Sequence, residues 1–397
     1  MKKILQAVFI FIVVFFIYFG TNSDFTFHPR WDIDYFNPLA QSLLHGRFDI
    51  VNPQQTYDLS EYKGKWFAPW GVLSALFLIP LQLLKGRFFP AAYLSFFFGS
   101  LNVCILWLLL NRLRKEYLPA LSTFSVYAVT VLYAFGTANF YVGTLGSVWH
   151  VDQMVSMFFG NLGIYFILKR KRNLRDYVLS SWCIMITFLG RPTLSMLLTL
   201  PALLFIKDYF LKKKLILLGL QTFGPAVFIC VSVFFFYNYV RFGNIFEYGY
   251  RYIHEAPDLE AMRLKNGSFS PVNLPVNLWY MTAEIPRISL EPVLHMDINL
   301  KGNSIFFLTP PLVAAFLASL IGPVTGPLWI TAIITMLPSL CVYSTGWMQF
   351  GYRYSLDITM LLIILSLFGL KGRINTLYYL GIIFSCVMYA WGIRILQ

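Results

Sequence analysis

Two carboxylates two residues apart, Asp32 and Asp34, follow closely after the first long apolar run of the chain, residues 4–20. Ionisable groups so close to lipid are costly, and they are usually retained for a partner or a function. A carboxylate held near apolar surface is suited to act as a general base, because burial raises its pKa towards the working pH. Its chemistry would be to take a proton from an acceptor hydroxyl or amine. Asp32 and Asp34 are therefore the candidate catalytic residues.

The segment after these acids has the pattern of a short amphipathic helix over residues 37–46. Pro38 suits its first turn and Gly46 suits its C-terminal cap. An Asp just before a helix is a common N-cap, so capping is the alternative role for either acid. One helix start needs one cap, which leaves the other carboxylate available for chemistry.

The composition of the chain is that of a membrane protein. Of 397 residues, 58% are hydrophobic and 12% are charged, whereas soluble domains average about 25% charged residues. Many apolar runs reach the roughly 20 residues that cross a bilayer. We expect an all-α polytopic membrane protein. Its five cysteines all fall within apolar runs, without metal-site or disulfide spacing, and are interpreted as packing residues.

The positive-inside rule decides the topology. If the apolar run 69–84 spans, the basic clusters at 112–115, 169–172 and 212–214 all lie outside. If it lies on the outer surface as a juxtamembrane helix, all of them lie inside, which satisfies the rule. We then expect eleven transmembrane helices, at about 4–20, 88–111, 117–138, 150–168, 176–190, 192–207, 215–240, 304–321, 325–343, 355–370 and 374–393.

This topology accounts for the charge of the chain. It places 16 of the 31 basic residues and 3 of the 18 acidic residues inside, so the whole net charge of +13 is inside and the outer face is neutral. The basic excess therefore needs no nucleic-acid partner. We expect a multi-pass protein of the plasma membrane, with a cytoplasmic N-terminus and an uncleaved signal-anchor. Residues 1–397 would form one transmembrane domain with two large outer loops, 21–87 and 241–303.

Several motifs resemble those of a known superfamily. The run Asp32-x-Asp34-Tyr35, followed by Ala40, Leu44, Gly46 and Arg47, resembles the first outer loop of GT-C glycosyltransferases, as does Tyr57-Asp58-Leu59-x₂-Tyr62-x-Gly64-x-Trp66-Phe67-x-Pro69. These polytopic enzymes use polyprenyl-phosphate-linked sugars and include protein O-mannosyltransferases and the lipid A aminoarabinose transferase. The resemblance implies a catalytic Asp directly after the first helix, for which Asp32 is the best positional match and Asp34 the runner-up. The chain departs from the family in having Asp-Ile-Asp instead of the acidic pair of many members, and Pro69-Trp70-Gly71 instead of Pro-Pro-Leu.

Three arginines are candidate ligands of the donor phosphate, for which a guanidinium is well shaped. Arg353 lies in the segment 346–357, which resembles a late-helix motif of bacterial GT-C-like proteins, and its alternative role is an ion pair with Asp357 four residues on. Arg191 lies at a break between two short helices, which could form a broken hairpin, and its alternative role is to cap exposed carbonyls. Arg287 lies in the second outer loop.

The candidate substrate-binding residues are aromatic or polar groups on the outer side, namely Tyr35, His150, Tyr250, Arg251 and Tyr352. The stretches 242–251 and 284–287 resemble the large outer loop that lines the donor or acceptor site in GT-C-like proteins. No metal-binding motif appears, so no metal or other cofactor is expected, and a divalent cation has no support in the sequence.

The leading hypothesis is a GT-C-type glycosyltransferase. It would move a sugar from a polyprenyl-phosphate donor to a lipid, glycan or protein acceptor on the extracytoplasmic face. A transporter or flippase of lipid-linked sugars is the first alternative, but it would need ionisable groups within the spans, and the span centres are nearly free of charge. A non-catalytic scaffold of the cell envelope on the same fold is the second.

Overall fold

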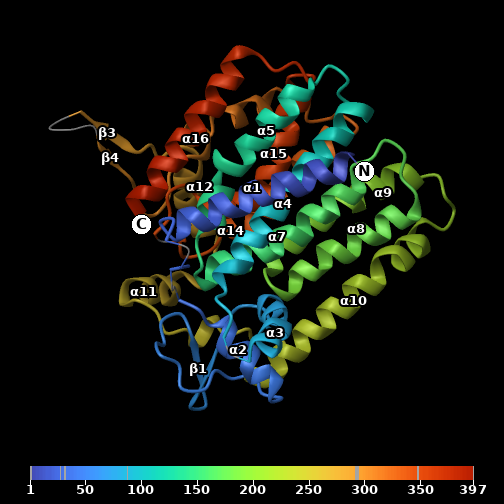
Figure 1. The fold of residues 1–397 in the computed structure, drawn as a ribbon. Helices are drawn as coiled ribbons and strands as arrows, with labels where there is room; N and C mark the ends of the chain where they lie inside the picture. Colours follow the sequence, from blue (N-terminus) through green and yellow to red (C-terminus); the bar gives the residue numbers. More distant parts are fainter. Residues whose placement is uncertain are drawn as a thin grey trace.

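The computed structural model describes residues 2–26, 28–30, 33–86, 88–290, 295–346 and 348–396, and these are mainly helical (Figure 1). Four of the described helices are long and apolar enough to cross a membrane. They are α1 (Lys2–Asn22), α4 (Ala92–Glu116), α10 (Leu215–Phe242) and α16 (Thr376–Leu396). A fifth span results if α5 (Thr123–Phe135) and α6 (Ala138–Thr144) count as one, since they are bent by 50° at their junction. The chain is therefore an integral membrane protein.

The other segments for which a span was predicted also contain helices, but shorter or more buried ones. They are α7 (Val148–Ile167), α8 (Leu174–Ile186), η1 (Thr187–Leu189), η2 (Pro192–Leu198), α9 (Thr199–Tyr209), α13 (Ile305–Leu308), η5 (Pro310–Leu317), α14 (Thr325–Leu340) and α15 (Leu356–Gly369). By length and composition the described helices support four or five spans, so the number eleven stays a prediction. The predicted break at 190–192 is confirmed, because η1 ends before it and η2 begins at Pro192.

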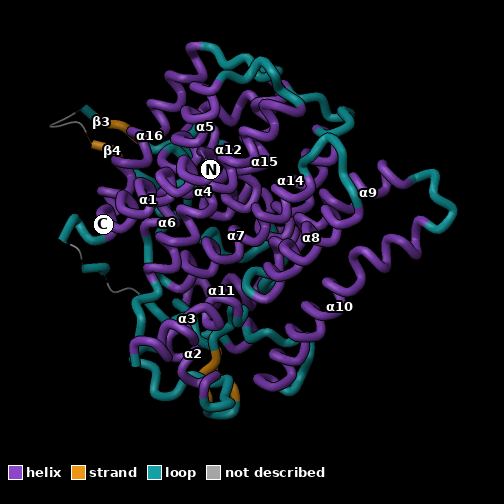
Figure 2. Tube along the Cα trace, turned by 45° about the vertical axis from the view of Figure 1, so that its right-hand side comes forward, coloured by secondary structure: helices purple, strands orange, loops and turns teal. Residues whose placement is uncertain are grey.

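The helices pack around α4 and α7. Helix α4 contacts α1 on one side and α7 on the other, and α7 also contacts α8. Helix α15 packs against η5 and α14. Large side chains such as Trp107 and Tyr133 are fully buried in this core. Helix α10 lies at the edge of the bundle, where it packs mainly against α8 and leaves most of its surface exposed (Figure 2).

A second layer of short elements lies together at one end of the bundle (Figure 1). It contains α2 (Phe36–Leu44), α3 (Leu73–Lys85), η3 (Tyr250–Tyr252) and α11 (Pro257–Asn266). The predicted amphipathic helix is confirmed as α2. The predicted juxtamembrane helix corresponds to α3, whose 13 residues would cover roughly 20 Å, too short for the ~30 Å hydrocarbon core. Helices η4 (Pro271–Asn273) and α12 (Leu274–Thr282) follow in the second loop.

Two short hairpins depart from the predicted all-α class. Strands β1 (Ser60–Tyr62) and β2 (Lys65–Phe67) pair antiparallel, with Ser60 opposite Phe67. Lys63 and Gly64 between them both have positive φ, as a two-residue type I′ turn requires. Strands β3 (Arg287–Ser289) and β4 (His295–Asp297) also pair antiparallel, with Arg287 opposite Asp297.

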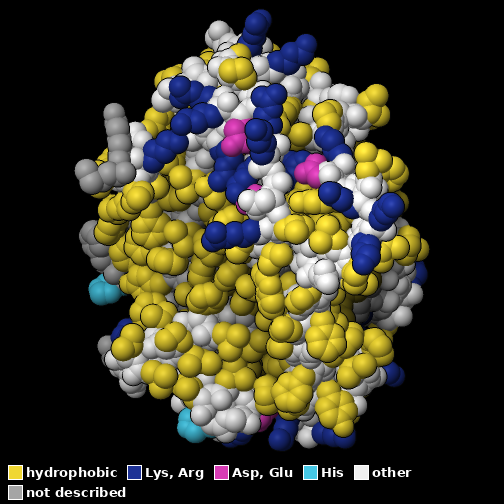
Figure 3. Space-filling model, turned by 90° about the vertical axis from the view of Figure 1, so that its right-hand side faces the viewer, with side chains coloured by type: hydrophobic (Ala, Val, Ile, Leu, Met, Phe, Trp, Pro, Cys, Tyr) yellow, Lys and Arg dark blue, Asp and Glu magenta, His cyan; other side chains and the backbone are white. Residues whose placement is uncertain are grey.

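The surface separates charge from apolar side chains. Figure 3 shows lysine and arginine side chains gathered over one end of the visible face, above a broad hydrophobic band. The structure places the three basic clusters that were predicted to lie inside at helix ends. Residues 112–115 are in the last turns of α4, residues 169–172 lie between α7 and α8, and residues 212–214 lie between α9 and α10. Which end faces the cytoplasm stays a prediction.

Candidate functional site

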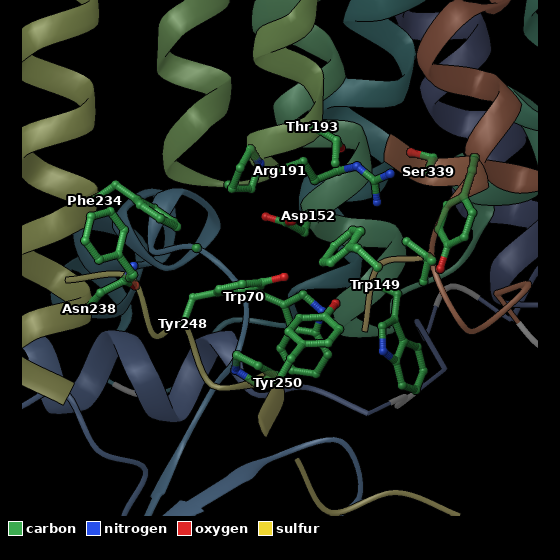
Figure 4. A pocket seen from close by; sticks show the side chains of 18 of the residues that line it. Trp70, Trp149, Asp152, Arg191, Thr193, Phe234, Asn238, Tyr248, Tyr250 and Ser339 are labelled. Atoms are coloured by element: carbon green, nitrogen blue, oxygen red, sulfur yellow. The ribbon is translucent and has the colours of Figure 1, made fainter. Parts of the chain in front are cut away.

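The main cavity lies where the bundle meets the layer of short elements. It encloses about 380 Å³ and is lined by residues of the first and second outer loops, α7, the 190–193 break, α10 and the 353–354 turn. Its walls are largely aromatic, with Trp70, Trp149, Tyr248 and Tyr250 among them. Figure 4 shows Asp152 near the middle of this cavity, with Arg191 above it and the two tyrosines below.

The broken helix brings Arg191 to the cavity. Pro192 cannot continue a helical hydrogen-bond ladder from the preceding turn, and Arg191 has extended backbone between η1 and η2. The first outer loop packs directly on this break. A Cβ atom on Gly71 would lie 1.9 Å from the Leu189 carbonyl oxygen, so only glycine permits this approach.

Arg191 is held by a buried ion pair. Its Nη2 lies 3.0 Å from Asp357 Oδ2, and Gln153 Nε2 donates to Asp357 Oδ1 at 2.9 Å. Both carboxylate oxygens of Asp357 therefore have partners. The alternative role of Arg191, capping exposed carbonyls, is not the arrangement found, and its Nε is buried without a hydrogen-bond partner in the described residues.

Arg353 has no such partner. Its side chain is buried and lines the cavity. The alternative role, an ion pair with Asp357, is not found, because Asp357 is bound to Arg191 and Gln153. Within the described residues its guanidinium makes a cation–π contact with Tyr354, at 5.2 Å from the ring centroid, and no ion pair or hydrogen bond. A buried cation of this kind is costly unless it binds an anion.

Asp152 is the acidic member of the cavity lining. It is buried in the first turns of α7, and Ser74 Oγ donates to its Oδ1 at 3.2 Å. The cavity lining therefore combines two guanidinium groups, one carboxylate and several aromatic rings.

A second acid, Asp58, lies in an adjoining chamber that shares Trp149 and Arg353 with the main cavity. Trp149 Nε1 donates to Asp58 Oδ2 at 3.1 Å. Burial and the nearby Glu255 carboxylate raise the pKa of Asp58 to about 7, although the Trp149 hydrogen bond and Arg353 act in the opposite direction. Asp58 is thus a carboxyl that changes charge near neutral pH.

Backbone pairing between the two outer loops holds Asp58 in place. The Asp58 N–H donates to the His254 carbonyl at 2.6 Å, and the His254 N–H donates to the Leu59 carbonyl at 2.7 Å. The next residue, Glu255, is buried and forms an ion pair with Arg263. It also accepts a hydrogen bond from the Tyr343 hydroxyl.

Of the two predicted catalytic acids, Asp32 lies outside the described residues, and Asp34 caps a helix. Asp34 Oδ1 accepts hydrogen bonds from the backbone N–H groups of Phe36 (3.0 Å) and Asn37 (3.1 Å) at the start of α2. Burial raises its pKa. Asp34 lines a different pocket, with Gln41 and Arg47, so the structure does not bring it together with Arg191 and Arg353.

Two predicted cations lie elsewhere. Arg287 is on strand β3 and lines a separate pocket with Glu284 and Asp297. Arg251 is exposed in η3 and does not line the main cavity. The sequence predicted both to lie in the second outer loop. The sequence of so long a loop does not show which of its side chains face a cavity.

The predicted aromatic and histidine ligands divide between the two cavities and the protein interior. Tyr250 lines the main cavity, and His150 lines the adjoining chamber. Tyr35 stacks on Trp70, with centroids 5.9 Å apart, and Tyr352 is buried with its hydroxyl 3.0 Å from Asn277 Oδ1. These last two support the walls and do not line the main cavity.

Sequence reasoning missed Asp58, Trp149 and Tyr354 as site residues. The available signal for Asp58 is its place in the stretch 57–69, which resembles GT-C sequences. In the described residues no group of three or more His, Cys, Asp or Glu side chains is arranged to hold a metal ion.

Comparisons with known proteins find similarity among solved structures. No family model matches the chain, and a search of curated proteins finds no match. Among solved structures, the chain resembles the crystal structure of ArnT from Cupriavidus metallidurans bound to undecaprenyl phosphate, with a TM-score of 0.46 and 12% sequence identity.

The match covers 94% of this chain and 60% of ArnT, so the chain spans less than two thirds of that protein's length. A likeness at this level carries no argument about activity, and the function must be argued from the site itself.

Proposed function

We propose that the protein is a GT-C-type glycosyltransferase that moves a sugar from a polyprenyl-phosphate-linked donor to an acceptor on the extracytoplasmic face of the plasma membrane. One observation carries the proposal. The buried guanidinium of Arg353, which has no ion-pair partner in the described residues, lies in an aromatic cavity beside a carboxyl whose pKa is about 7. An anion-binding group and a base are thus adjacent.

The shape of the cavity favours an amphiphilic donor. Arg353 and Arg191 would bind the donor phosphate, and the rings of Tyr248 and Tyr250 offer faces on which a sugar can stack. Phe234 and Phe235 of α10 line the same cavity. Helix α10 is long and apolar enough to span a membrane, and most of its surface is exposed. A polyprenyl chain could therefore extend from the phosphate along α10 into the bilayer. The proposal does not extend to Arg287.

The reaction would be a single displacement at the anomeric carbon of the sugar. A carboxylate takes the proton from the acceptor hydroxyl, and the acceptor oxygen forms a bond to the anomeric carbon. The bond between that carbon and the phosphate oxygen breaks, and its electron pair leaves with the polyprenyl phosphate. The guanidinium groups stabilise the negative charge that develops on this leaving group.

The base is an Asp of the first outer loop, residues 21–87. Asp58 is favoured by its pKa of about 7 and by its position between Trp149 and Arg353. Asp32 remains a candidate for the base, as the sequence predicts. Its neighbour Ile33 lines the same chamber as Asp58. Asp34 is the least favoured, because its carboxylate caps α2.

Lipid analysis of cells that lack the protein tests the proposal. We expect a polyprenyl-phosphate sugar to accumulate, and wild-type protein to clear it. Asp58→Asn should slow this clearance by about 10²–10⁴-fold, the usual effect of losing a general base. Asp32→Asn and Asp34→Asn, assayed in parallel, identify which acid is the base.

Asp258→Asn serves as the control, because Asp258 is an exposed acid on α11, and it should behave as wild type. The proposed mechanism is excluded if the single and combined Asn variants at positions 32, 34 and 58 all clear the lipid normally at equal expression. The absence of any accumulated lipid-linked sugar would argue against the glycosyltransferase itself.

Donor binding tests the role of Arg353 separately. Arg353→Ala breaks no ion pair of the described structure, so it should fold. It should bind undecaprenyl phosphate roughly 10–100-fold more weakly, the size of a lost charge-assisted hydrogen bond. Native mass spectrometry of the purified protein measures this directly. Arg251→Ala, which removes an exposed cation of the same region, should leave binding unchanged, and equal retention by both variants would contradict the assignment.

A further inference from the structure

A second chamber of about 430 Å³ adjoins the main cavity. It is lined by the first outer loop, α6, the start of α7, α11 and the 344–353 segment, and by Leu396 of α16. Trp149 and Arg353 contribute to both cavities. A group bound in the chamber and a group bound in the main cavity would therefore meet at these two residues.

His150 lines this chamber and has an unused hydrogen-bonding atom. Its side chain is 6% exposed, and its Nδ1 is hydrogen-bonded to the Ser147 hydroxyl, which fixes the ring. Its Nε2 is buried and has no hydrogen-bond partner in the described residues. Buried polar atoms are almost always hydrogen-bonded in native proteins. The unpaired Nε2 therefore indicates a bound ligand that supplies the missing hydrogen bond.

The charges of the chamber limit what that ligand can be. Of the described lining residues, Asp58 is the acid and Arg353 the cation, and the main cavity shares that cation. Glu255, which is paired with Arg263, adds a second carboxylate near Asp58. A phosphate-bearing acceptor would face these carboxylates with one cation, already placed to bind the donor phosphate. The chamber therefore favours a neutral acceptor.

The remaining lining suits a sugar ring. Tyr57 and Trp149 supply aromatic surface, and Ser344 supplies a hydroxyl, next to the His150 and Asp58 side chains. The volume lies within the ~300–1,000 Å³ range of small-ligand pockets. A saccharide carries several hydroxyl groups on one small ring, which can pair with several of these side chains at once.

We infer that the second chamber receives the acceptor, that the acceptor is a neutral saccharide, and that His150 Nε2 positions its hydroxyl groups beside Asp58. This inference rests on the proposed function, because Asp58 acts as the base in both. His150 is a positioning residue here, since its role is to orient a hydroxyl that loses its proton to Asp58.

Saturation-transfer difference NMR on the purified protein in detergent tests the inference. The probes are methyl α-mannoside, methyl β-galactoside, methyl N-acetylglucosaminide, a blocked serine tripeptide and glycerol phosphate. We expect at least one methyl glycoside to receive saturation from the wild-type protein, and the peptide and the phosphate to receive little. His150→Phe keeps an aromatic ring but removes Nε2, and should reduce the glycoside signal at least threefold.

A second pair of variants protects the test against misfolding at His150. Leu259→Trp fills the chamber from α11, where Leu259 lines it, and should also reduce the glycoside signal at least threefold. Leu264→Trp lies on the same helix but is 73% exposed, and should leave the signal unchanged. His150→Gln, whose amide reaches the Nε2 position, should restore part of it.

Undecaprenyl phosphate binding, measured on the same samples by native mass spectrometry, separates the two proposals. Loss of the glycoside signal in His150→Phe and Leu259→Trp, with lipid binding retained, supports the inference. It is overturned if no glycoside is saturated, if both variants keep the full signal, or if the peptide or the phosphate gives the chamber-dependent signal. A wild-type protein that binds no undecaprenyl phosphate would count against the proposed function, whatever the glycosides show.

Discussion

Asp58 shows how single residues acquire chemistry from their surroundings. The sequence gives no sign that the pKa of the Asp58 carboxyl differs from that of any other. In the folded protein, burial and the Glu255 carboxylate raise its pKa from 3.8 to about 7. The folded protein therefore binds this proton more tightly than the unfolded chain does. Ionisation of Asp58 therefore opposes folding. As the pH rises from about 4 to about 7, the contribution of Asp58 lowers the free energy of unfolding.

This pKa predicts the pH dependence of the activity. Only ionised Asp58 accepts a proton, so the transfer rate should rise with pH through about 7 and then level off. Glu255→Gln removes the like charge and should move this rise to lower pH. The rate of donor consumption in membranes between pH 5 and pH 9 measures both effects.

Glu61→Gln is the matched control, because Glu61 is an exposed carboxyl of the same loop, and it should leave the profile unchanged. A rate that is independent of pH over this range in the wild type would contradict Asp58 as the base. Thermal unfolding gives an independent check, since Asp58→Asn should stabilise the protein at pH 8 and have little effect at pH 4.

The break between η1 and η2 shows how the secondary elements place the site. The break directs Arg191 towards the cavity. The first outer loop packs against the same break, where Gly71 contacts Leu189. The start of α3 follows at once, so Ser74 reaches Asp152. One close contact thus aligns a loop, a broken helix and α7.

Gly71→Ala should disrupt this alignment. The added methyl group would lie 1.9 Å from the Leu189 carbonyl oxygen, and overpacking of this kind costs about 1–3 kcal/mol or more. We expect a lower unfolding temperature in detergent and impaired clearance of the lipid-linked sugar. Differential scanning fluorimetry measures the first effect.

Gly224→Ala is the matched control. A Cβ atom there meets nothing within 4 Å, and in the interior of α10 alanine is favoured over glycine by about 0.5–1 kcal/mol. A Gly71→Ala protein as stable as Gly224→Ala would mean that the loop does not dock on the break as described.

At the scale of the whole molecule, the face seen in Figure 3 combines a broad hydrophobic band with a gathering of Lys and Arg side chains towards one end. The predicted topology puts the basic clusters inside and both cavities outside. The proposed reaction depends on this arrangement, because the acceptor is expected on the extracytoplasmic face.

Cysteine labelling of intact cells tests the orientation. In a variant with the five native cysteines replaced, Lys65→Cys in the first outer loop should react with a membrane-impermeant maleimide. Lys213→Cys, between α9 and α10, should react only after permeabilisation. The reverse pattern would place the cavities on the cytoplasmic side and would exclude an extracytoplasmic reaction.

The sequence by itself determined the membrane class, the short helix after the two acids, predicted over 37–46 and found at 36–44, and the break before Pro192. These follow from local composition and from the conformational limits of proline and glycine, which act wherever the residue stands. Only the tertiary structure decided which charged groups have partners. Arg191 takes Asp357 from 166 positions away, which leaves Arg353 unpaired in the described residues, and Trp149 bonds Asp58 across 91 positions. Ion pairs and pKa values depend on distances of a few ångströms, and no spacing along the chain determines these distances.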